Sequence, residues 1–343
     1  MAWQMDVERG RQNMAGFCSY CAVCNGKACA GKIPGMGGRD SGRTFQNNVQ
    51  ALQEIAVPMK ILYDSQQPPD LHTKVLGYEL SLPVMPSPIG GCDFNMSATI
   101  DEDSYVQALM KGCVEEGIAV GLGDGAHDII AQAANRGIAR YPGWGLPFIK
   151  PWSDAIFFDK LKQLEKLEIH AVGIDLDSLG LSNVKLRGES IPLRTNRQLK
   201  ALLAQVPYPV VVKGVTDADE AEILVELGAA GLVVSNHGGR ILDCSPGTAT
   251  VLPAIVKRLK GTVPILVDGG VQTGLDVYKM LLLGADSVMI GRAFTRAVMS
   301  DLEQGAAQYI RQLKADFSHA MLMTGCRTVV EIYKGGTGSL SDS

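Results

Sequence analysis

Several side chains suited to acid–base chemistry stand at the ends of apolar stretches. The run GLVVSN (231–236) leads directly into His237, with Arg240 three residues later, while Lys213 and Asp175 end two other runs. Histidine titrates near neutral pH, a nearby aspartate could fix its tautomer, and arginine can clamp a carboxylate. A buried lysine needs an anionic or electron-rich partner. The set predicts oxidation of a carbon that bears a hydroxyl group.

Two glycine-rich turns predict a phosphate site beside these residues. VDGGVQTG contributes Asp268, Gly269 and Gly270, and MIGRAF contributes Gly291 and Arg292. Each turn precedes an expected helix, so backbone N–H groups and the helix dipole would face an anion. Barrels often hold phosphate in their last two loops.

The elements that must position these residues alternate between short apolar runs and amphipathic stretches. Thr99 with Glu102 has the spacing of a capping box, while Thr216 with Asp217, and Thr248, open further expected helices. Buried β-branched runs followed by helices predict the α/β class, as a single (β/α)8 TIM barrel with its site at the carboxyl ends of the strands. The eight expected strands are 83–87, 118–122, 146–150, 171–176, 209–215, 231–236, 264–270 and 287–291.

Three regions follow from this pattern. Residues 1–82 form an N-terminal extension, 83–332 the barrel, and 333–343 an expected flexible tail. The longest helical tract, 301–323, is expected to be the eighth barrel helix.

Composition narrows the classes of function. The net charge of −4 gives no sign of a nucleic-acid partner, and the sequence has no apolar run long enough to span a membrane. No pattern of a signal peptide is visible, so we expect a cytoplasmic enzyme without disulfides. We also expect a homo-oligomer.

Several motifs resemble those of FMN-dependent α-hydroxy acid oxidases and dehydrogenases, the lactate and glycolate oxidase-like family. The most specific, SNHGGRILD (235–243), is similar to the family's SNHGGRQLD-type signature. The resemblance runs from about Thr44 to Ile332 and includes FQNNVQAL, ILYDS, LGYELSLPVMPSPIGG, PVVVKGV, LVDGGVQTGLDVYKMLLLGADSVMIGR and MTGCRTVVEI.

This resemblance implies a role for each candidate. Lys213 would stabilise negative charge on reduced FMN, Ser235 would line the flavin, and Gly90 would approach it by its backbone. His237 would be the general base with Asp175 behind it, and Arg240 would bind the carboxylate of a hydroxy acid substrate. The residues that would hold the FMN phosphate and ribityl chain are Asp268, Gly269, Gly270, Gly291 and Arg292.

The sequence also departs from the family pattern. Leu181 and Ser182 stand where the family has a second carboxylate-binding arginine, and Gln272 replaces an arginine on the phosphate side. Ile149-Lys150-Pro151 replaces Gln-Leu-Tyr, which makes Lys150 or Trp152 candidate substitutes at the flavin. An FMN-dependent isomerase of the isopentenyl diphosphate isomerase type 2 kind and a non-catalytic flavin barrel therefore remain alternatives. The electron acceptor stays open between oxygen, a quinone and a carrier protein.

One motif lies outside the resemblance. Cys18, Cys21, Cys24 and Cys29 follow a C-x2-C-x2-C-x4-C spacing. The spacing favours a metal site, either a [4Fe–4S] cluster or zinc, with free thiols as the alternative. A cluster beside FMN would give electrons an exit and would favour a dehydrogenase over an oxidase.

Overall fold

A computed structural model describes residues 5–60, 62, 67–181, 184 and 191–336. The stretch ILYDS lies outside this part apart from Leu62, as does Ser182. None of the helices in these ranges has the length and apolarity needed to cross a bilayer.

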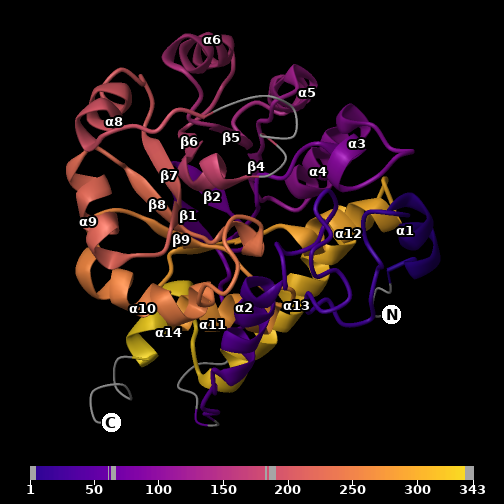
Figure 1. Cartoon of the computed structure of the whole chain (residues 1–343). Helices are drawn as coiled ribbons and strands as arrows, with labels where there is room; N and C mark the ends of the chain where they lie inside the picture. Colours follow the sequence, from indigo (N-terminus) through magenta and orange to yellow (C-terminus); the bar gives the residue numbers. More distant parts are fainter. Residues whose placement is uncertain (1–4, 61, 63–66, 182–183, 185–190, 337–343) are drawn as a thin grey trace.

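Parallel strands form the centre of the fold (Figure 1). The described sheet has eight strands in the order β3-β10-β9-β8-β7-β6-β5-β4. Its two end strands also lie close together, since a Cβ added at Gly121 in β4 would be 2.5 Å from the carbonyl oxygen of Pro86 in β3. The predicted barrel is confirmed, and each predicted strand overlaps one of β3 (Val84–Pro86), β4 (Val120–Leu122), β5 (Gly145–Ile149), β6 (Val172–Asp175), β7 (Val210–Val215), β8 (Gly231–Val234), β9 (Ile265–Val267) and β10 (Ser287–Ile290).

Helices surround the sheet and bury its outer face. Nearly every strand residue is buried, which explains why the strands read as continuous apolar runs without alternation. The surrounding helices are α3 (Cys92–Asn95), α4 (Glu102–Glu115), α5 (Asp128–Arg140), α6 (Asp154–Leu164), α8 (Asn196–Leu203), α9 (Ala218–Glu226), α10 (Thr248–Leu259), α11 (Gly274–Leu282), α12 (Arg292–Ser300), α13 (Gly305–Thr324) and α14 (Val329–Gly336).

Helix boundaries differ from the predictions in three places. The tract expected at 301–323 is helix α13, which begins at Gly305 and follows α12 rather than the last strand. The N-cap of α4 is Asp101, which accepts from Ser104 N, so the capping box predicted from Thr99 is wrong. Glu102 instead accepts hydrogen bonds from the backbone N–H groups of Gly91 and Cys92, so its carboxylate is not available for a capping box. Helix α14 runs to Gly336, so the expected flexible tail begins inside a helix, and 337–343 lie outside the described residues.

A small hairpin closes the amino-terminal end of the barrel. It pairs β1 (Thr73–Val75) with β2 (Tyr78–Leu80), and its apolar side chains pack against the inward-facing residues of the strands. The hydroxyl of Tyr78 donates to the carbonyl of Gly145, the first residue of β5. Among the described residues, the cavity that could take a ligand lies at the opposite end.

The N-terminal extension wraps around the open end. Helix α1 (Val7–Asn13) lies beside α12, and α2 (Arg43–Glu54) lies near α10 (Figure 1). The N-cap of α2, Gly42, offers no side chain, so Asp243 caps the helix by accepting from Ser41 N at 2.8 Å and Thr44 N at 3.2 Å. The last residue of the SNHGGRILD motif thus holds the extension in place.

Candidate active site

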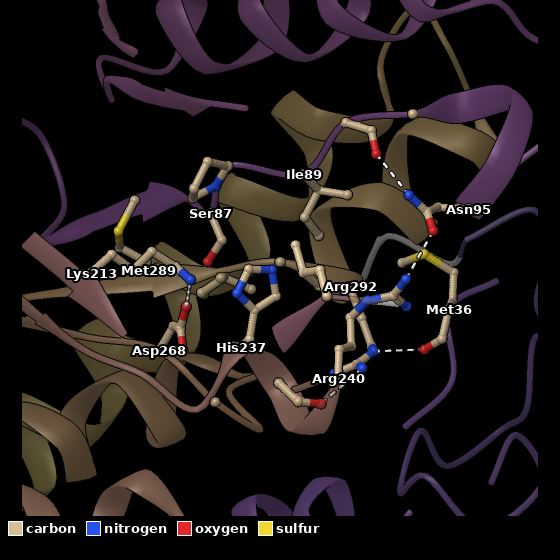
Figure 2. Close-up of a pocket in the computed structure, with 18 of the residues that line it drawn as sticks. Met36, Ser87, Ile89, Asn95, Lys213, His237, Arg240, Asp268, Met289 and Arg292 are labelled. Atoms are coloured by element: carbon tan, nitrogen blue, oxygen red, sulfur yellow. Dashed lines mark hydrogen bonds and ion pairs between the residues drawn. The ribbon is translucent and has the colours of Figure 1, made fainter. Parts of the chain in front are cut away.

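A cavity lies at the carboxyl ends of the strands, where the sequence predicts the site. Figure 2 shows Lys213 and Asp268 on one side of it, Arg240 and Arg292 on the other, and His237 between them. The predicted residues in its wall are Gly90, Lys213, His237, Arg240, Asp268, Gly269, Gly270, Gly291 and Arg292.

The chain turns sharply at His237. This residue has a φ of 54°, and Gly238 and Gly239 follow with φ values of 62° and 79°. A side chain at Gly239 would place its Cβ 2.6 Å from the backbone nitrogen of Phe45 in α2. The two glycines therefore let the backbone reverse beneath α2, and the strained histidine presents its ring to the cavity.

The carboxylate that directly contacts His237 belongs to Asp177. Its Oδ1 lies 2.9 Å from His237 Nδ1, whereas Asp175 Oδ1 lies 3.6 Å away. Asp175, the partner expected behind the histidine, stays near the ring but does not make the hydrogen bond, which is corrected to Asp177. The 3-10 turn η1 (Leu176–Gly180) brings Asp177 back toward the ring. When Asp177 is ionised, this contact places the proton on Nδ1 and leaves Nε2 able to accept one.

Asp175 instead joins two buried lysines. Its carboxylate lies 3.3 Å from Lys213 Nζ and 3.2 Å from Lys150 Nζ. Burial alone would raise the pKa of Asp175, but Lys213, His237 and Lys150 hold it well below its usual value. Burial disfavours the Lys213 ammonium, yet Asp175 and Asp268 raise its pKa above the ordinary value. Lys213 thus carries a fixed positive charge, which suits stabilisation of an anionic group.

Asp177 has the opposite environment. Burial raises the pKa of its carboxyl, the nearby Asp175 adds to the rise, and His237 and Lys213 oppose it. Its Oδ2 is buried without a hydrogen-bond partner among the described residues. Positive charge on the His237 ring therefore favours the ionised form of Asp177, so the two groups are coupled.

Both arginines are held by backbone carbonyls of the extension. Arg240 Nη1 donates to Gly35 O and Nη2 to Asn95 Oδ1. Arg292 Nε donates to Met36 O at 2.8 Å, and its guanidinium lies 3.8 Å from the centre of the Phe45 ring (Figure 2). Burial and repulsion from Arg292 lower the pKa of Arg240 to about 9. The IPGMGG stretch, residues 33–38, therefore lies at the edge of the cavity, which Met36 also lines.

Two predicted residues do not line the cavity. Asp175 lies behind the lysines, and Ser235 is fully buried with its hydroxyl accepting from His237 N at 3.1 Å. Lys150 does line the cavity, whereas Trp152 is turned away and donates to Asp124 Oδ2 at 2.6 Å.

Sequence reasoning missed Asp177, Asn95 and Asp124. Asp177 lies two residues after a predicted aspartate, and its nearness to a strand end was the available signal. Asn95, the last residue of α3, follows the expected strand 83–87 in a segment without a recognisable motif. Asp124 orders the wall by accepting from the backbone of Lys150 and pairing with Lys160 at 3.0 Å.

Residues in the wall fit a flavin mononucleotide. Among the described residues, Ser87 Oγ and Asp268 Oδ1 are buried without hydrogen-bond partners, and both residues line the cavity near Lys213. These atoms, the lysine and the two glycine turns offer the mixed donors and acceptors that a polar ring edge, a ribityl chain and a phosphate require. Fold and site together define the class of parallel-barrel flavoenzymes.

The chain belongs to the FMN-dependent dehydrogenase family, whose pattern matches residues 35–191 and 186–337. It is therefore an FMN-dependent oxidoreductase. An L-lactate oxidase from Lacticaseibacillus rhamnosus is 31% identical over 89% of this chain and 91% of its own length. A peroxisomal (S)-2-hydroxyacid oxidase, GLO3 of Arabidopsis thaliana, is 30% identical over 86% and 88%.

Solved structures support the fold. A mandelate oxidase variant with 2-hydroxy-phenylacetamide superposes with a TM-score of 0.75 at 22% identity, covering 97% of each chain. A flavocytochrome b2 variant with pyruvate bound gives 0.74 at 26% identity, covering 86% of this chain and 78% of that one. The family assignment and the barrel predicted from the sequence are both confirmed.

Proposed function

We propose that this enzyme oxidises a 2-hydroxy acid to the corresponding keto acid, with His237 as general base. The observation that carries the proposal is the 2.9 Å contact between His237 Nδ1 and Asp177 inside the cavity wall. It leaves Nε2 as the proton acceptor, and both Asp177 and Asp175 stabilise the resulting imidazolium. This intact acid–base pair argues against a non-catalytic barrel.

FMN, when bound, supplies the acceptor for the two electrons of the reaction. Lys213, Asp268 and the turns at Gly269-Gly270 and Gly291 would hold it. The Arg292 guanidinium is occupied by carbonyls, so we assign its phosphate contact to its backbone N–H at the start of α12. Lys150 adds a second buried cation beside Asp175.

Arg240 would bind the substrate carboxylate. Two of its nitrogen atoms already donate to Gly35 O and Asn95 Oδ1. A substrate carboxylate would therefore have to replace the contact between Arg240 and the carbonyl of the 33–38 stretch. Leu181 lines the cavity at the position of the family's second arginine, which leaves Arg240 as the proposed single clamp.

Apolar side chains dominate the rest of the wall. This favours a 2-hydroxy acid with an aliphatic or aromatic substituent over glycolate, because such a substituent would bury apolar surface. These apolar residues include Met36, Ile89, Phe94, Ile130, Leu181 and Val184.

Anaerobic mixing of the FMN-loaded enzyme with glycolate, lactate, 2-hydroxyisocaproate and mandelate tests the proposal. We expect flavin bleaching, fastest with the larger substrates. His237→Ala should abolish bleaching while FMN stays bound, and His319→Ala, an exposed histidine on α13, is the matched control. Absence of bleaching with every hydroxy acid would refute the function. Cytoplasmic location, homo-oligomeric assembly and a carrier protein as electron acceptor remain proposals from the sequence.

A further inference from the structure

The four cysteines of residues 18–29 are shielded in part from solvent. Each is half-buried and none forms a disulfide, whereas Val23 between them is 61% exposed and Ala22, Lys27 and Ala28 are also exposed. The stretch contains no helix or strand. Tyr20 and Cys18 pack against the hydrophobic core, whereas the cysteines at 21, 24 and 29 stay half-buried in a loop whose aliphatic side chain, Val23, faces outward.

Residues next to the flavin site anchor this loop. Arg296 of α12 donates to Cys21 O at 2.9 Å, and Gln272 donates to Cys24 O at 3.0 Å. The Tyr20 hydroxyl donates back to Arg296 O at 2.6 Å. Cys24 itself lines the cavity. The loop therefore lies beside the predicted phosphate turns, and Gln272 fixes it from the position where the family has an arginine.

The surroundings suit a group with negative charge. The Arg296 guanidinium lies 4.4 Å from the centre of the Tyr20 ring, and its Nε is buried without a hydrogen-bond partner among the described residues. Tyr20 N donates to Cys18 Sγ at 3.4 Å. The buried side chain of Arg296 and the N–H···S bond to Cys18 would offset part of the charge of metal-bound thiolates.

The four sulfurs are not gathered as closely as a single zinc ion requires. In a tetrahedral zinc site, Zn–S distances of about 2.3 Å place the sulfurs about 3.8 Å apart. Within the described ranges, no three cysteine sulfurs lie within 4.8 Å of one another. A [4Fe–4S] cluster binds each thiolate through a different iron, so its ligands lie farther apart than those of a single ion.

We propose that Cys18, Cys21, Cys24 and Cys29 bind a [4Fe–4S] cluster that passes electrons from the flavin site to a one-electron carrier protein. Cluster binding is independent of the function proposed for the barrel, whereas the electron path rests on that function. Conversion of the substrate C–OH to a carbonyl releases two protons and two electrons. FMN would take up both electrons, His237 would pass the hydroxyl proton on to solvent, and the second proton would leave the reduced flavin as it is reoxidised. The four cysteines would hold a cluster that carries one electron at a time, so oxidation of one substrate molecule would reduce two carrier molecules and leave FMN and the cluster oxidised.

Metal analysis of the full-length protein tests the proposal. Protein purified anaerobically and reconstituted with iron and sulfide should hold about four iron and four acid-labile sulfide per chain. Dithionite should produce an electron paramagnetic resonance signal from the reduced cluster. The double variant Cys18→Ser with Cys21→Ser should lose the iron and the signal but keep FMN. Cys244→Ser, which changes an exposed cysteine outside the loop, should keep all three.

Several results would overturn the cluster. These are an iron-free protein after reconstitution, one zinc per chain in place of iron, or unchanged iron in the double variant. If the double variant does not fold, Cys29→Ser provides the same comparison, with circular dichroism as the check of folding. A failure of every hydroxy acid to bleach the flavin would refute the barrel's function but leave the iron count unaffected. Equal rates of carrier reduction by wild type and the cluster-free variant would refute the electron path.

Discussion

Replacing Asp177 and Asp175 separately by asparagine should produce two different defects. Asp177 contacts His237 at 2.9 Å, so its charge stabilises the imidazolium formed when the base accepts a proton. At an effective dielectric constant of about 20, charges about 4 Å apart interact by about 4 kcal/mol. Asp175 remains 3.6 Å away and retains part of this effect. We therefore expect Asp177→Asn to slow flavin reduction by about 10²–10³-fold.

Asp175→Asn should mainly affect stability and flavin binding. The change leaves Lys150 and Lys213 buried without their shared carboxylate, and Asp268 at 3.7 Å from Lys213 compensates only in part. Breaking a buried ion pair by removing one partner costs about 3–5 kcal/mol. Denaturant unfolding and FMN retention measure this defect.

Anaerobic stopped-flow spectroscopy on FMN-loaded protein separates the rate defect of Asp177→Asn from the stability defect of Asp175→Asn. Asp159→Asn, an exposed residue of α6, is the matched control and should behave like wild type. The assignment of Asp177 would be refuted if Asp177→Asn reduced its flavin within threefold of wild type while folded Asp175→Asn lost the rate.

Three further changes test other contacts. Arg240→Lys should raise the KM for a hydroxy acid about tenfold with a smaller effect on kcat, because lysine lacks the bidentate fork; equal steady-state constants would exclude this clamp. Gly239→Ala should destabilise the protein by about 1–3 kcal/mol in denaturant titrations, because its φ of 79° and the backbone of Phe45 oppose a side chain; unchanged stability would contradict the tightness of this turn. Asp243→Ala should lower stability at pH 7 by about 1 kcal/mol, since it removes the cap of α2. Burial slightly opposes the charge of Asp243, but hydrogen bonds lower its pKa to about 2, below the value in the unfolded chain. The difference in stability between wild type and Asp243→Ala should therefore fade as the pH drops from about 4 toward 2. A stability difference that persists undiminished at pH 2 would refute this linkage.

The strands were predictable because burial on both faces leaves little choice of residue. The strands at 209–215 and 231–236 lie between the barrel interior and the surrounding helices. Both of their faces are buried, so their residues are mostly apolar and β-branched. Most of the candidate site was also predictable, because residues at strand ends converge once the barrel is recognised.

Contacts made by turns and by the backbone were not predictable. Asp177 and Asp175 differ by two positions, and only the course of η1 shows which one reaches His237. Backbone carbonyls of Gly35 and Met36 hold Arg240 and Arg292, and a carbonyl has no signature in a sequence. The prediction of the α4 cap failed for a similar reason, since the backbone partners of Glu102 lie at the start of α3.

In the IPGMGG stretch (33–38), the backbone holds an arginine in place, while a side chain shapes the cavity that would select the substrate. Gly37 has no room for a side chain, because an added Cβ would lie 2.1 Å from Cys29 O. Met36, between two glycines, holds Arg292 by its carbonyl while its side chain lines the cavity. Mutation at this one position can therefore reshape the substituent pocket without releasing the arginine. Divergence among relatives, or directed evolution toward a new hydroxy acid, could proceed through residue 36 while the catalytic groups stay fixed.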